Sequence, residues 1–269
     1  MIGTSIGHQL ALAGAAVVAI VSAATGVRPV YVGRQPVVQR LVEATWMSAA
    51  DSAAGEVRTR APWAFLASAD SALSSEQFVE DRRAFIADLV GTGRIEPARA
   101  ESLATFAVRE AYIKRVPPAL VFGVLMAENN TFKSRARSSV GATGLMQVYG
   151  KVWVPTLGKF FGRDLADDET NLRYGVHILS QNLYRSAAEV ATAGGALSKG
   201  LLRYNGCVRG ANTPSCHRYP DRVRRAVEQY AIAQCGEGGY ARCVEEPLRA
   251  SIAAGDAADA RSEARYATR

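Results

Sequence analysis

Residues 117–148 read PPALVFGVLMAENNTFKSRARSSVGATGLMQV and combine an apolar helix pattern, one carboxylate and a glycine-rich loop. Pro117 and Pro118 predict a helix start, because the first helical turn needs no backbone donor. Glu128 lies four residues after Val124, on the apolar face of this helix, so its side chain should point toward the core. The apolar positions at helical spacing are Leu120, Val121, Val124 and Leu125.

A carboxyl group at such a position favours its protonated form, because burial disfavours charge. A protonated Glu128 can donate a proton to a leaving oxygen near neutral pH, as glutamic acids do in glycoside cleavage. The alternative is an ordinary glutamate at a helix end, exposed or paired with Lys133 or Arg135.

The loop after this helix is rich in glycine. Gly141 and Gly144 flank Ala142 and Thr143, and glycines at this density let a backbone run close to a ligand or form a tight turn before a buried segment. From Ser138 onward the loop follows the pattern S-x-x-G-A-x-G-L-M-Q-[LV]. It therefore resembles the signature of bacterial lytic transglycosylases of the soluble type, the SLT domain.

Three other segments resemble motifs of the same family in the same order. Residues 166–183 resemble its D-P-x-x-N-I-x-x-G-x-x-Y-L helix, and residues 196–210 its A-x-x-x-Y-N-x-G element with a shortened spacing to glycine. Residues 217–230 resemble its final Y-P-x-x-V helix. The positions in register are Asn171, Gly175, Tyr204, Asn205 and Tyr219. The chain departs from the family's E-S-x-F motif at Asn129 and by one extra residue before Phe132.

The resemblance implies an all-α, lysozyme-like domain over residues 110–233, with a groove around the catalytic acid Glu128. Gln147 and Asn205 would hold N-acetyl or hydroxyl groups of the sugar, and Ser138 and Tyr219 would orient Glu128 or the saccharide. Met146 and Tyr204 are expected in the same substrate-binding set.

The implied reaction cleaves the β-1,4 bond between N-acetylmuramic acid and N-acetylglucosamine in peptidoglycan, forming 1,6-anhydro-N-acetylmuramic acid without a metal or other cofactor. A first alternative is a lysozyme-type hydrolase, in which an Asp of residues 164–169 or Asp221 positions a water. A second is a wall-binding, envelope-assembly protein with little turnover, suggested by Asn129 and the shortened Tyr204-Asn205 element.

The composition agrees with a cell-wall partner. The formal net charge of +7 and pI near 9.4 suit nucleic acid, an anionic membrane or an acidic wall. Lys and Arg are dispersed, and aromatic residues amount to only 8%, which argues against a nucleic-acid groove. Glycan strands of peptidoglycan are therefore the expected partner.

Residues 10–27, LALAGAAVVAIVSAATGV, are uncharged and close to the length that crosses a bilayer. They predict a signal peptide or a membrane anchor within residues 1–27, and hence a periplasmic or envelope location with envelope machinery as a further partner. Arg28 and Arg34 follow the segment and no Lys or Arg precedes it, an order unusual for a signal peptide. A buried core helix is the remaining alternative.

The four cysteines lie in the last third of the chain, and an even count in an exported protein predicts disulfides. Three connectivities exist, of which the local ones join Cys207 to Cys216 and Cys235 to Cys243. We expect the first, beside Asn205. Zinc is the rival, with His217 next to Cys216, but no Cys-x-x-Cys accompanies it. The acids of residues 164–169 lack calcium-loop spacing and predict a helix start instead.

The remaining segments predict an accessory helical region over residues 28–109 and a tail over residues 234–269. A linker at residues 28–36 and a helix at residues 37–57 are expected first. Ser74 and Gln77 then suggest a capping box, and Pro97 opens a further helix toward Tyr112. Residues 251–269, poor in large apolar side chains, predict frayed helix or disorder.

Overall fold

The computed structural model describes residues 31–32, 35–36, 69–207 and 215–254. The chain divides into two compact units, Met1–Thr59 and Arg60–Arg269. In the first unit, β1 (Tyr31–Val32) and β2 (Gln35–Pro36) pair antiparallel within the expected linker. The apolar segment at residues 10–27 and the expected helix at residues 37–57 lie outside the described residues. Within the described ranges, no helix combines the length and apolar character needed to cross a membrane.

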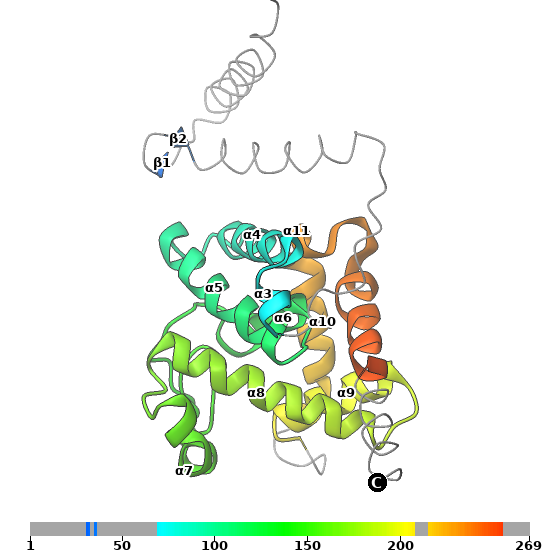
Figure 1. Cartoon of the computed structure of the whole chain (residues 1–269). Coiled ribbons are helices and arrows are strands. Elements are labelled where there is room, and N and C mark those ends of the chain that lie inside the picture. Colours follow the sequence, from blue (N-terminus) through cyan, green and yellow to red (C-terminus); the bar gives the residue numbers. More distant parts are fainter. Residues whose placement is uncertain (1–30, 33–34, 37–68, 208–214, 255–269) are drawn as a thin grey trace, which may run out of the picture. The chain divides into compact units, whose positions relative to one another are not determined.

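The second unit is helical (Figure 1), which confirms the all-α fold class. Residues 246–254 are also helical. The elements in chain order are α3 (Ala69–Leu73), α4 (Glu76–Gly91), α5 (Pro97–Ile113), α6 (Pro118–Asn129), α7 (Gly150–Phe161), α8 (Asp168–Ala187), α9 (Ala193–Tyr204), η2 (Cys216–Arg218), α10 (Tyr219–Tyr230), α11 (Ile232–Cys235), η3 (Gly236–Gly238) and η4 (Ala241–Glu245).

Helix α6 is the central element of this unit. It begins at Pro118, as predicted, and packs against α4, α5, α10 and η4. Because its sequence is apolar on all sides, every residue from Pro118 to Met126 is buried. Phe122 meets Phe85 of α4 edge to face at 5.5 Å between ring centroids. The helix that carries Glu128 is therefore held on several sides by core packing.

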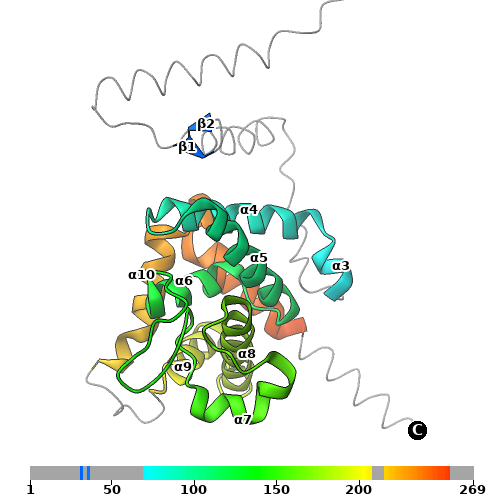
Figure 2. The ribbon, with the colours of Figure 1, turned by 90° about the vertical axis from the view of Figure 1, so that its left-hand side faces the viewer.

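Helix α10 lies beside α6 (Figure 2), and a glycine allows their close approach. A Cβ atom on Gly123 would lie 2.5 Å from Val227 Cγ2 and 3.1 Å from the backbone oxygen of Val223. Glu128 near the end of α6 contacts Tyr219 at the start of α10, so the two helices run antiparallel. This packing brings the start of α10 to the end of α6.

Both local disulfides are present, and the one between Cys207 and Cys216 confirms the predicted pairing. Cys207 joins Cys216 with a Cα–Cα distance of 5.5 Å, and Cys235 joins Cys243 at 4.9 Å. The first links the residues after α9 to η2, immediately before Tyr219. The disulfide therefore ties the end of α9 to the start of α10.

Asp88 of α4 supplies the cap that α11 lacks in its own sequence. Its carboxyl oxygens accept hydrogen bonds from the backbone N–H of Ala233 at 2.7 Å and of Gln234 at 3.1 Å, and from Gln234 Nε2 at 2.9 Å. Burial raises the pKa of Asp88 to about 6, although these donors oppose the rise. A buried polar contact thus joins α4 to the C-terminal part of the chain.

Some expectations differ from the structure. The cap of α4 is Ser75, whose hydroxyl accepts from the N–H of Phe78, whereas Ser74 Oγ bonds back to Asp70 and Ser71. Capping requires an extended backbone immediately before the helix, which Ser75 has.

The C-terminal segment is also more ordered than predicted over residues 251–254, which are helical. Ser251 is fully buried and donates to the carbonyl oxygen of Arg115 at 2.8 Å. The buried residues Val244 and Leu248 hold this helix on the core. Helix α5 crosses the expected boundary at residues 109–110, and its buried face joins the same core as α6.

We predict that Gly123→Ala destabilises the protein by about 1–3 kcal/mol, the typical cost of inserting a methyl group into a packed contact. The added Cβ would meet Val227 and Val223 of α10 and move Tyr219 away from Glu128. Thermal unfolding monitored by circular dichroism measures the loss.

Gly91→Ala is the matched control, because nothing lies within 4 Å of a Cβ at this position. It should leave stability unchanged or raise it by about 0.5–1 kcal/mol through helix propensity. Equal stability of the two variants would refute the proposed tight contact between α6 and α10.

Candidate active site

Glu128 lies in the last turn of α6, half-buried, with its carboxylate directed at α10. The hydroxyl of Tyr219, the first residue of α10, donates a hydrogen bond of 2.6 Å to Glu128 Oε1. Both Lys133 and Arg135 are described, and neither forms an ion pair with Glu128. The structure therefore contradicts the alternative in which Glu128 forms a salt bridge with Lys133 or Arg135.

The surroundings of Glu128 change its acidity. Burial raises the pKa of its carboxyl above the usual value, while the Tyr219 hydrogen bond and the charge of Arg222 lower it in part. Burial and the neighbouring Glu128 charge raise the pKa of Tyr219 well above its usual value. Tyr219 thus remains a hydrogen-bond donor, and Glu128 retains a proton to higher pH than an exposed glutamate does.

A second tyrosine supports the first. The rings of Tyr204 and Tyr219 stack at 6.5 Å between centroids with an interplanar angle of 22°. The hydroxyl of Tyr204 donates to the backbone oxygen of Met146 at 2.8 Å. Tyr204 therefore connects the end of α9 to both the glycine-rich loop and the residue that contacts Glu128.

The loop of residues 136–148 folds back on itself through backbone pairing. Thr143 pairs with both Arg137 and Val148. Gly144 has a φ of +87°, and a Cβ there would lie 2.1 Å from the side chain of Asn171. Gly144 lets the loop approach α8 closely, because glycine tolerates a positive φ and has no Cβ that would meet Asn171.

Helix α8 holds the loop through Asn171 and Gly175. Asn171 Nδ2 donates to the backbone oxygens of Thr143 and Leu165, each at 2.9 Å, and its Oδ1 accepts from the N–H of Met146 at 2.8 Å. At Gly175 a Cβ would lie 2.3 Å from Met146 Sδ. These two residues fit the loop against α8.

The structure corrects the expected role of Met146. It was expected to bind substrate, but its side chain is 0% exposed and packs against Gly175 in the core. The neighbouring Leu145 is equally buried, so this part of the motif anchors the loop. The sequence pattern could not separate anchoring residues from contact residues within one motif.

Asn129 is a positioning residue that sequence reasoning treated only as a departure from the family. It is 6% exposed, and its Nδ2 donates to the backbone oxygens of Lys133 at 2.8 Å and Gly144 at 3.1 Å. Its Oδ1 accepts from the Thr131 hydroxyl at 3.1 Å and the Lys133 N–H at 3.3 Å. The residue next to Glu128 therefore binds the glycine-rich loop to the end of α6.

The remaining expected site residues lie on the same loop or at the end of α9. Ser138 Oγ accepts from the N–H of Ala142 at 3.0 Å, so it closes the loop turn, and in the described part of the chain it forms no hydrogen bond with Glu128. Gln147, with a φ of +48°, donates to the backbone oxygen of Gly144 at 2.8 Å. Asn205 is the half-buried C-cap of α9. The structure joins Glu128, Tyr219 and Tyr204 by direct contacts. Ser138, Gln147 and Asn205 are connected to them only through the backbone of the loop and of α9.

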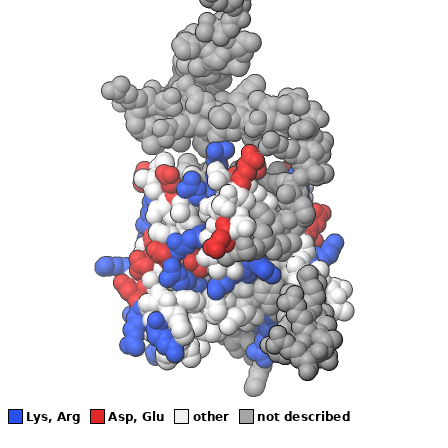
Figure 3. All heavy atoms as spheres, in the orientation of Figure 1, with Lys and Arg blue, Asp and Glu red and all other residues white. Residues whose placement is uncertain are grey.

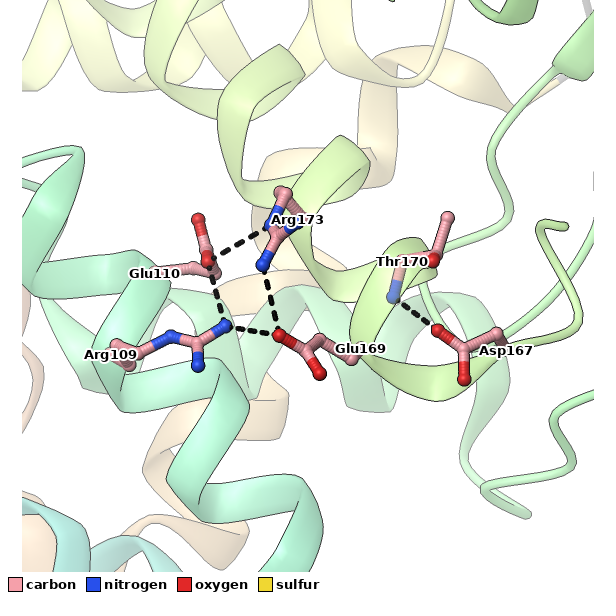
Figure 4. Close-up of polar contacts among 6 residues, drawn as sticks. All are labelled: Arg109, Glu110, Asp167, Glu169, Thr170 and Arg173. Atoms are coloured by element: carbon pink, nitrogen blue, oxygen red, sulfur yellow. Dashed lines mark hydrogen bonds and ion pairs between the residues drawn. The ribbon is translucent and has the colours of Figure 1, made fainter. Parts of the chain in front are cut away.

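The acids of residues 164–169 serve the fold. Asp167 caps α8 by accepting from the N–H of Thr170 at 2.8 Å, which confirms the predicted helix start. Figure 4 shows Glu169 between Arg109 at 2.6 Å and Arg173 at 2.9 Å, with Glu110 completing the cluster.

The other two acids of this stretch also have partners. Asp168 pairs with Arg99 at 3.1 Å, and Asp164 Oδ1 accepts from the N–H of Ala166 at 2.8 Å. Across the part of the chain that is described, no group of three or more His, Cys, Asp or Glu side chains could hold a metal ion.

The comparisons with known proteins agree with this arrangement. Residues 106–212 match the family model described as Transglycosylase SLT domain. No curated protein and no solved structure matches the chain. The matched range includes Glu128, the glycine-rich loop, Asn171 and Tyr204, and Tyr219 follows shortly after it. The chain therefore contains a transglycosylase SLT domain, the domain of lytic transglycosylases and lysozyme-like proteins that act on peptidoglycan.

Proposed function

We propose that this protein is a lytic transglycosylase that cleaves the β-1,4 bond between N-acetylmuramic acid and N-acetylglucosamine and forms 1,6-anhydro-N-acetylmuramic acid. The observation that carries the proposal is the half-buried Glu128, whose pKa is raised and whose Oε1 accepts a hydrogen bond from Tyr219. A protonated carboxyl near neutral pH is what the leaving oxygen of a glycosidic bond needs.

Glu128 would act twice. It first gives its proton to the bridging oxygen as the glycosidic bond breaks, and the substrate's 2-acetamido group supports the cationic carbon. The Glu128 carboxylate then takes the proton of the 6-hydroxyl, and that oxygen bonds to the same carbon and closes the anhydro ring. Between these steps Tyr219 donates to the carboxylate, which its raised pKa allows.

The distribution of carboxylates favours this reaction over hydrolysis. Residues 129–163 contain no Asp or Glu, and each acid of residues 164–169 accepts a backbone hydrogen bond or forms an ion pair. An inverting or retaining hydrolase needs a second free carboxylate across the bond. Asp221, exposed in the first turn of α10, is the remaining candidate for that alternative.

The supporting residues are assigned as follows. Gln147 and Asn205 would contact N-acetyl or hydroxyl groups of the sugar, and Ser138 would shape the loop that faces it. Residues 10–27 would direct the chain to the periplasm or cell envelope as a signal peptide or anchor, where envelope machinery could recruit it.

A wall-binding protein without turnover would share the groove and lack only the catalytic step.

We predict that Glu128→Gln lowers turnover of purified peptidoglycan by at least about 10²–10⁴-fold, because the amide cannot donate the proton. The melting temperature should stay close to that of the parent, since Gln can still accept from Tyr219. Asp221→Asn is the matched control and should retain activity. Residual activity of Glu128→Gln within a few-fold of the parent would exclude it as the acid.

Tyr219→Phe should shift the pH dependence. The Tyr219 hydrogen bond lowers the pKa of Glu128, so its removal raises that pKa further and keeps the acid protonated to higher pH. The alkaline limb of kcat/KM should therefore move upward. The rate at the optimum should fall about 10-fold, since a hydrogen bond to a charged group contributes about 1.5 kcal/mol. A downward shift of the limb would contradict this coupling.

The products should distinguish the two enzyme classes. We predict released muropeptides that end in 1,6-anhydro-N-acetylmuramic acid, each one water lighter than a lysozyme product and resistant to borohydride reduction. Mass spectrometry of a digest of purified sacculi measures both properties. Mainly reducible ends would instead indicate hydrolysis and direct attention to Asp221.

A further inference from the structure

Three exposed arginines form a stripe along α10, which we call the arginine stripe: Arg218, Arg222 and Arg225. Their spacing of four and then three residues places them on one helix face. Among the described residues none of the three has an ion-pair partner, whereas the adjacent Arg224 pairs with Glu228 at 2.8 Å. On the face drawn in Figure 3, by contrast, basic and acidic side chains are interspersed.

Arg222 of the arginine stripe lies close to the candidate catalytic carboxyl. The guanidinium carbon of Arg222 lies 5.0 Å from the centroid of the Tyr219 ring, within the range of a cation–π contact. Tyr219 in turn bonds to Glu128 at 2.6 Å. A ligand held by Arg222 would therefore lie next to the bond on which Glu128 acts.

Helix stability does not account for these arginines. Arg218 is the N-cap residue of α10 and Arg222 follows within its first turns, where positive charge opposes the helix dipole. Like charges three or four residues apart also repel one another on a helix surface. Asp221, three residues after Arg218 and four before Arg225, offsets part of this repulsion, and a bound anion would offset the rest.

The chemistry of the stripe favours carboxylates. Arginine presents a planar fork of donors that matches a carboxylate in a bidentate manner. A membrane-binding helix would also need exposed apolar side chains, and among the described residues the exposed large hydrophobics lie outside α10.

We propose that the arginine stripe binds the carboxylates of the peptide branches that peptidoglycan carries on its muramic acid sugars. This inference rests on the proposed function and names the part of the substrate that the protein recognises besides the glycan. The enzyme would accordingly prefer strands that still carry peptides over bare glycan. Because exposed charge pairs are screened by ions, this preference should weaken as salt rises.

The test uses the full chain and two substrates, intact sacculi and the same sacculi after an amidase has removed the peptides. The double variant Arg222→Gln/Arg225→Gln should raise KM on intact sacculi about 10-fold or more, as expected for the loss of charge-assisted hydrogen bonds. On peptide-free glycan, parent and variant should have the same KM; kcat is left out of this comparison, because the charge of Arg222 lowers the pKa of Glu128. Arg83→Gln on α4, also exposed and outside the site, is the matched control and should change neither value.

Several outcomes would overturn the proposal. An equal loss on both substrates would assign the arginines to the glycan or to Glu128, and no loss on either would make the stripe a solvated surface. A variant that loses binding to anionic vesicles while keeping its KM would indicate a membrane surface instead.

Binding without turnover separates this inference from the proposed function. In the Glu128→Gln background, co-sedimentation with the two kinds of sacculi should show a loss of binding on intact sacculi when Arg222 and Arg225 are replaced. This result would hold even if the parent protein cleaved neither substrate, in which case only the proposed function would fail. Unchanged co-sedimentation would refute the proposed role of the arginine stripe, whether or not the protein is active.

Discussion

The antiparallel contact between α6 and α10 is the constraint on which the candidate site depends. Gly123 lacks the Cβ that would meet Val227 and Val223, so the two helices approach closely. This approach places the Tyr219 hydroxyl 2.6 Å from Glu128 Oε1. Burial then raises the pKa of the carboxyl, and the same hydrogen bond limits the rise. The close packing of α10 against Gly123 thus influences the pKa of the Glu128 carboxyl.

Two buried amides hold the glycine-rich loop at the end of α6. Asn129 binds it to the end of α6 through Gly144, and Asn171 binds it to α8 through Thr143 and Met146. Buried polar groups without partners are costly, so a fully bonded amide fixes its neighbours strongly. Both amides bond mainly to backbone atoms, so they fix the loop conformation together with Ser138 and Gln147 of the loop itself.

Charge is divided between structural and functional roles. Asp167 caps α8, Asp168 and Glu169 pair with arginines of α5 and α8, and Asp164 accepts a backbone hydrogen bond, so these acids support the fold. Glu128 stands apart, with a tyrosine as its bonded partner. On α10 the pattern is reversed, because Arg218, Arg222 and Arg225 form no ion pair within the described part of the chain and Arg222 lies over the Tyr219 ring. An enzyme for a large anionic polymer can use both features, one for chemistry and one for substrate attachment.

The sequence by itself predicted the helix from Pro118, the inward position of Glu128, the SLT motif and the Cys207–Cys216 disulfide, because these follow from helical spacing, a short signature and local cysteine separation. It did not predict the Ser75 cap, the buried place of Met146 or the clamp made by Asn129. Only the tertiary structure decided those, together with the role of Gly123. Spacing along the chain shows which side of a helix is apolar, whereas the partner on that side comes from residues far away in sequence, and their contacts exist only after folding.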